Sequence, residues 1–146
     1  MEIPDQFIAE HVVLRGKMET LRASQKPPDA AKTTALLTEL QETIRRHFRH
    51  EDVFYRVLDN DRRVGDRGAM HQVRNDPAAV IFGLESLAIR LRKNGPTPEW
   101  QGKLQNLLNI LLPHFEQEEK ELFPEALKLL RPAEIEAIQS ELARGE

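Results

Sequence analysis

Apolar residues recur every three or four positions along most of the chain, which is the spacing of a helix face turned into a core. The clearest stretch runs from Leu104 to Leu130, and a second runs from Leu40 to Leu58. The full pattern predicts helices at about 4–24, 30–58, 69–93 and 98–130, followed by a short helix at 133–143. The protein is therefore expected to be mainly helical.

Helix-breaking residues separate these stretches. Pro27 and Pro28 follow the first, and Asp29 is a good N-cap for the second. A polar connection of about ten residues at 59–68 precedes the third. Further breaks are expected at Asn94-Gly95-Pro96 and at Arg131-Pro132.

Two of the apolar seams carry a polar pair where the pattern calls for leucine. His114 and Glu118 lie one helical turn apart on the fourth stretch, and His47 and Glu51 repeat the spacing on the second. Burial of an imidazole and a carboxylate costs several kcal/mol unless each finds a partner. Two facing helices that each offer HxxxE predict a cage for two metal ions.

Two further histidines extend this set. His11 replaces an apolar residue on the seam of the first helix, between Phe7 and Leu14. His71 lies in the third stretch, before Pro77, and the phase of the apolar pattern changes between them. Either the helix kinks at Pro77, or His71 sits on a separate turn capped by Asp76.

Two residues near Glu51, His50 and Tyr55, are further candidates for the site. His50 lies on an adjacent helix face and is expected to flank the site without binding metal. Tyr55 could donate a hydrogen bond to a ligand, but packing with its phenol at the surface is the plainer expectation.

The donor types favour a dinuclear centre. Imidazole nitrogen suits iron, zinc, copper and nickel, whereas carboxylate oxygen suits harder ions and can bridge two metals. Four histidines and two carboxylates would give each metal two imidazoles and both shared carboxylates. A mononuclear zinc site would need only three or four of these six groups.

The ordered series H, HxxxE, H, HxxxE over four helices resembles the hemerythrin-like, or HHE cation-binding, domain. The tail HFEQEEKELFPEAL resembles the last metal-binding helix of that family, and the resemblance covers about Phe7 to Leu130. It implies an all-α, up-down-up-down four-helix bundle over about 5–130, with a short extra C-terminal helix at about 132–144. The whole chain, 1–146, is expected to be one such domain.

The resemblance also implies a cofactor of two non-haem iron ions, with an oxo or hydroxo bridge between them; zinc or manganese are the alternative metals. By this resemblance His11 and His47 would bind one iron. His71 and His114 would bind the other, and Glu51 and Glu118 would bridge the two.

Two departures from oxygen-carrying hemerythrins affect the expected function. Those proteins have a further histidine one turn after the position of His71, where this chain has Asn75. Their last bridging residue is an aspartate five positions after the histidine, whereas Glu118 is four positions after His114. A missing imidazole leaves one iron more open to other chemistry than reversible oxygen carriage.

The composition of the chain excludes several kinds of ligand and partner. The 146 residues include no cysteine, which excludes disulfides and thiolate ligands and fits a cytoplasmic protein. A net charge of −3 argues against nucleic acid as a partner, and no stretch has the pattern of a signal peptide or a membrane span.

Three functions are consistent with these features. The first is a non-catalytic di-iron protein that senses, binds or sequesters oxygen, nitric oxide or iron. The second is a di-iron enzyme of the same fold that is peroxidase-like, processes nitric oxide or donates iron. The third is a metal-free helical interaction module in which the buried histidines and glutamates only pair with each other.

Overall fold

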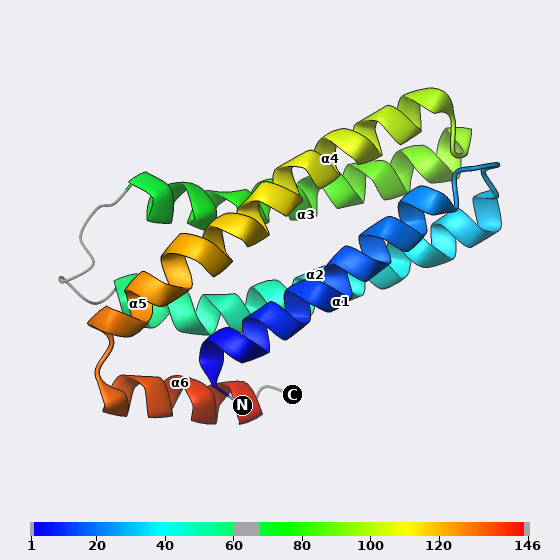
Figure 1. The fold of residues 1–146 in the computed structure, drawn as a ribbon. Coiled ribbons are helices and arrows are strands. Elements are labelled where there is room, and N and C mark those ends of the chain that lie inside the picture. Colours follow the sequence, from blue (N-terminus) through cyan, green and yellow to red (C-terminus); the bar gives the residue numbers. More distant parts are fainter. Residues whose placement is uncertain (1, 60–67, 145–146) are drawn as a thin grey trace.

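The computed structural model describes residues 2–59 and 68–144, without the side chains of residues 59 and 68–75. Four long helices run alternately up and down and form a bundle (Figure 1). They are α1 (Ile3–Ala23), α2 (Ala30–Asp59), α3 (Gly68–Asn94) and α4 (Pro98–Gln117). The chain continues through a π-helical turn, η1 (Glu118–Leu122), into α5 (Phe123–Leu129) and then α6 (Pro132–Arg144). The predicted all-α four-helix bundle with a short C-terminal helix is confirmed.

The helix ends follow the local signals in the sequence. Asp29 accepts a hydrogen bond from the backbone N–H of Lys32 at the start of α2, and Thr97 caps α4 by accepting one from Trp100 at 3.1 Å. Gly95 follows α3 with φ of 73°, a left-handed conformation that glycine adopts without a steric penalty. The predicted polar connection at 59–68 falls largely outside the described residues.

Proline has different effects in α3 and after α4. Helix α3 passes through Pro77 as one element, so the alternative of a separate turn capped by Asp76 is wrong. In the last long helix, α-helical geometry changes at η1, where the backbone N–H of Phe123 bonds to the carbonyl of Glu118 five residues earlier. Pro124 has no N–H to complete a normal α-helical turn, which favours this wider one.

The interior consists of two apolar clusters. One fills the half of the bundle near the α1–α2 and α3–α4 connections, and includes Leu14, Ile44 and Leu111. The other lies toward the opposite end, and includes Phe7 and Phe54. The buried residues His11, Glu51 and Glu118 fall between these two sets along the chain, so a buried polar layer lies where the clusters meet.

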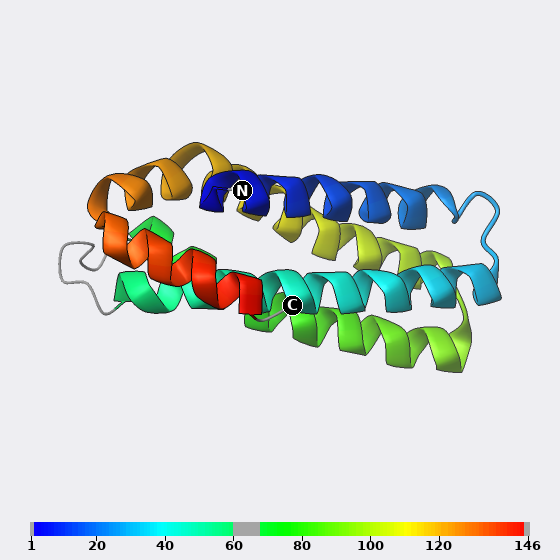
Figure 2. The ribbon, with the colours of Figure 1, turned by 90° about the horizontal axis from the view of Figure 1, so that it is seen from below.

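Helix α6 packs beside α2, near the start of α1 (Figure 2). Its buried Ile138 and Leu142 join the same cluster as Ile3 and Phe7. None of the described helices combines the length and apolar character that crossing a membrane requires.

Candidate metal centre

Three helices and the π-helical turn bring five of the six predicted ligands into the polar layer. His11 comes from α1, His47 and Glu51 from α2, His114 from α4 and Glu118 from the first position of η1. All five side chains are buried, with at most 2% of each residue exposed. The apolar seams that predicted these helices therefore carry the polar residues inward.

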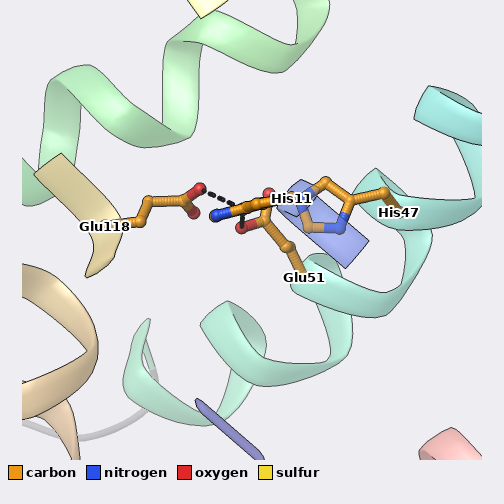
Figure 3. A group of neighbouring side chains, drawn as sticks. All are labelled: His11, His47, Glu51 and Glu118. Carbon is orange, nitrogen blue, oxygen red and sulfur yellow. Dashed lines mark hydrogen bonds and ion pairs between the residues drawn. The ribbon is translucent and has the colours of Figure 1, made fainter. Parts of the chain in front are cut away.

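Four of these side chains converge on one point (Figure 3). One donor atom from each of His11, His47, Glu51 and Glu118 lies within 4.8 Å of all the others. His11 Nε2 is 3.1 Å from His47 Nε2 and 3.2 Å from Glu118 Oε1. His47 Nε2 is 3.2 Å from Glu51 Oε1.

His114 borders this group on the side of α3. Its Nε2 lies 3.3 Å from Glu118 Oε1 and 4.0 Å from Glu51 Oε1. Both carboxylates thus lie between His114 and the pair formed by His11 and His47. His71 belongs to α3, but its side chain and that of Asn75 are outside the described residues.

The opposite nitrogen of each imidazole faces an outer carboxylate. Glu10 accepts a hydrogen bond from His47 Nδ1 at 2.6 Å, and Asp76 accepts one from His114 Nδ1 at 2.9 Å. His11 Nδ1 is 3.6 Å from Glu119 Oε1, an ion-pair distance. Each of these three carboxylates lies outside the inner group of donor atoms.

The outer carboxylates select the form of the imidazoles that can bind a metal. An ionised carboxylate only accepts hydrogen bonds, so Nδ1 of His47 and of His114 must carry the hydrogen. The Nε2 lone pair is then directed toward the interior when the ring is neutral. Carboxylates commonly orient metal-binding histidines in this way and raise their basicity.

Two further contacts hold the inner and outer carboxylates. Arg15 donates two hydrogen bonds to Glu119, at 2.9 and 2.7 Å. Tyr55 donates one to Glu118 Oε2 at 2.6 Å, and only 5% of the tyrosine is exposed. The expectation that the phenol of Tyr55 reaches the surface is therefore wrong.

His50 is buried and does not belong to the converging group. Its Nδ1 donates to Glu10 Oε2 at 2.7 Å, so Glu10 links His50 to His47. His50 therefore flanks the group as expected.

The electrostatics favour charged side chains in this layer. Burial would lower the pKa of His47, but the charge of Glu51 and the hydrogen bond to Glu10 outweigh it and raise the pKa to about 10. Burial likewise opposes protonation of His114, yet its contacts with Glu118 and Glu51 raise its pKa to about 11. Without a metal, both imidazoles are protonated at neutral pH.

The pKa values of the two inner carboxylates are shifted in opposite directions. Burial acts to raise the pKa of Glu51, but the charge of His47 and close polar contacts with the other groups of the layer hold it well below its usual value. Burial and the neighbouring charge of Glu51 raise the pKa of Glu118. A bound cation would favour the ionised form of both groups.

Several buried polar atoms in the layer lack a hydrogen-bond partner. They include both carboxylate oxygens of Glu51, Oε1 of Glu118 and Nε2 of His114. Such atoms are costly to bury unless something else satisfies them. All are atom types that bind metal ions, so this set of donors fits the metal ions expected from the sequence.

Sequence periodicity did not identify Glu10 and Glu119 as contacts of the site. Each is adjacent in sequence to a predicted ligand, His11 or Glu118, and so points to the side of its helix. The sequence suggested Asp76 only as the cap of a separate turn. The available signal was an acidic residue directly beside a predicted ligand, as at Glu10 and Glu119, but pairing across helices depends on how the helices pack.

Comparison with known proteins agrees with the chemistry of this layer. Residues 2–126 match the family of the hemerythrin HHE cation binding domain. No curated protein and no solved structure gave a significant match. The matched region includes all the predicted ligands and ends before α6. This chain therefore belongs to the hemerythrin HHE cation-binding family.

Proposed function

We propose that the protein is a non-haem di-iron protein that senses, binds or sequesters oxygen, nitric oxide or iron. The observation that carries this proposal is the arrangement of three imidazoles. Nε2 of His11, His47 and His114 faces two buried carboxylates, while each Nδ1 faces an outer acidic residue. Packing of the interior alone does not require this arrangement. A cation bound between the carboxylates would pair with the nitrogen and oxygen atoms that face inward.

The positions of the described side chains support five of the six assigned ligands, and His71 is assigned from the sequence pattern. His11 and His47 would hold one ion, and His114 would hold the second together with His71. Glu51 and Glu118 lie between His114 and the pair His11 and His47, and would bridge the ions. Bound iron would supply redox-active coordination positions for a diatomic ligand.

The remaining residues of the layer orient these groups. Tyr55 holds one oxygen of Glu118, which leaves Oε1 directed toward His11 and His114. Phe115 stacks on His11, with ring centroids 4.2 Å apart, and helps to exclude water from that side. These contacts favour a stable binding centre, and no described residue beside it has an evident role as a separate catalytic acid or base.

Metal content per chain tests the proposal directly. Protein purified without a metal-affinity tag should contain about two irons per chain and show near-ultraviolet charge-transfer bands. Glu118→Ala should lose at least one metal position, because it removes a bridging carboxylate. The matched control is Glu121→Ala, an exposed glutamate in the same π-helical turn, which should keep full occupancy.

Two outcomes would contradict the proposal. Absence of iron after anaerobic reconstitution would favour a zinc site or the metal-free interaction module. Full occupancy in Glu118→Ala would show that this residue does not bridge.

A further inference from the structure

A groove runs along the outer side of α1 and α2, next to the metal-binding layer. Its volume is about 810 Å³, within the range of about 300–1,000 Å³ typical of small-molecule sites. The groove reaches the outer side of His47, where Glu10 and His50 are hydrogen bonded. It is separate from the converging donor atoms, which face the interior.

Helix α6 forms the third wall of this groove. Gln139, Leu142 and Ala143 line it, and they face residues of α1 and α2. The match to the family ends at residue 126, so this wall is built by a segment outside the matched domain. The addition turns an exposed seam between two helices into a groove with three walls that stays open to solvent.

The lining indicates the chemistry of a ligand. Ala9, Val13 and Leu142 provide apolar surface, and Arg46 provides a positive charge. Arg46 has neither an ion pair nor a hydrogen bond with any side chain in the described part of the chain. The nearby carboxylate of Glu10 already accepts hydrogen bonds from two histidines, His47 and His50.

Glu2, the other acidic residue that lines the groove, lies at the opposite end of the groove from Arg46. The contact between His11 and His47 sets the register of α1 against α2 and places Arg46 opposite the segment Glu10–Val13. Glu2 precedes Val13 by eleven residues, or about 16 Å at the helical rise of 1.5 Å per residue. The positive end of the groove is thus distant from Glu2.

We propose that this groove binds a small organic carboxylate. The carboxylate would pair with the guanidinium of Arg46, and the apolar body of the molecule would lie against Val13 and Leu142. The site does not depend on the metal, since none of its contacts uses the interior nitrogen atoms.

Calorimetric titration of the protein as purified with hexanoate tests the site. We expect saturable binding of one molecule per chain, with hexanol and hexylammonium at least tenfold weaker because they lack the negative charge. Arg46→Ala should weaken hexanoate binding about tenfold. Val13→Trp, which places a bulky side chain at a half-exposed position in the groove, should abolish it.

Arg49→Ala is the matched control. Arg49 is an exposed cation on the same helix and lines a neighbouring groove instead of this one. It should leave hexanoate affinity unchanged. Equal losses in the two arginine variants would overturn the proposal in favour of general charge attraction.

The other outcomes also distinguish the alternatives. Equal affinity for hexanol would show an apolar surface without carboxylate recognition. Binding that disappears on metal removal but persists in Arg46→Ala would place the carboxylate on the metal. Either result, or no saturable binding, overturns the site. Absence of iron after anaerobic reconstitution, with hexanoate binding intact, would instead count against the di-iron function alone.

Discussion

His47 shows how one side chain is fitted for a metal from both sides. Its Nδ1 donates to Glu10 at 2.6 Å, and its Nε2 faces Glu51 at 3.2 Å. The outer contact fixes the position of the hydrogen, and the inner atom is left for a cation. Asp76 gives His114 the same arrangement from a different helix.

Replacement of Glu10 by glutamine should weaken metal binding about tenfold, the lower end of the effect seen for such orienting groups. Glutamine preserves the shape of the side chain but removes the charge that supports the imidazole. Competition with a chromogenic chelator measures the change.

Glu85→Gln is the control, because among the described residues Glu85 pairs only with Arg45, on the surface, where both side chains are exposed. Its metal affinity should equal that of the unmodified protein. Unchanged affinity in Glu10→Gln would show that the outer carboxylate does not tune the site.

At the scale of the element, η1 keeps a long helix in phase with the core. A π turn contains more residues than an α turn, so it rotates the following segment relative to continued α geometry. The residues that follow Glu118 therefore stay buried at positions Leu122, Phe123 and Ala126. Phe123 packs against Phe7 and Phe54, with ring centroids 5.4 and 5.8 Å apart.

Phe123→Ala should therefore lower the free energy of unfolding by about 3–5 kcal/mol, the usual cost of removing a buried aromatic ring. The loss should appear in urea unfolding of the metal-free protein. Phe82→Ala is the control, because Phe82 is 73% exposed and its removal should change stability by less than about 0.5 kcal/mol. Similar effects in both variants would contradict the packing assigned to η1 and α5.

At the scale of the whole molecule, a charged layer lies between two apolar clusters. The pKa values of His47 and His114 are about 10 and 11 in the folded protein, against an ordinary value of 6.5. The folded state therefore binds more protons than the unfolded state above pH 6.5. This stabilisation is fully present below that pH and is lost as the pH rises toward 10.

The metal-free protein should accordingly become less stable between pH 6.5 and 9.5, as measured by urea unfolding at a series of pH values. The raised pKa of Glu118 acts in the same direction. The low pKa of Glu51 contributes stability above its ordinary value of 4.5, so it does not oppose the trend in this range. Metal-loaded protein should lack this decline, since binding displaces the imidazole protons. Stability that increases with pH in the metal-free protein would refute the assignment.

The sequence alone determined the fold class and the inward-facing polar residues. Helical periodicity fixes which residues share a face, and caps and prolines fix where most helices end. These local rules predicted most ends of α1 to α4, and both ends of α6, within about one residue. They also placed His11, His47, Glu51, His114 and Glu118 on core seams, where the structure has them.

Only the tertiary structure decided which groups meet. Glu10, Asp76 and Tyr55 contact residues from other helices, and their partners depend on the register and rotation of those helices. Periodicity gives the face of a helix but not the neighbour across it. The π turn at Glu118 arises from the absent N–H of Pro124 together with the packing of Phe123. The groove beside Arg46 forms because α6 returns to cover α1 and α2.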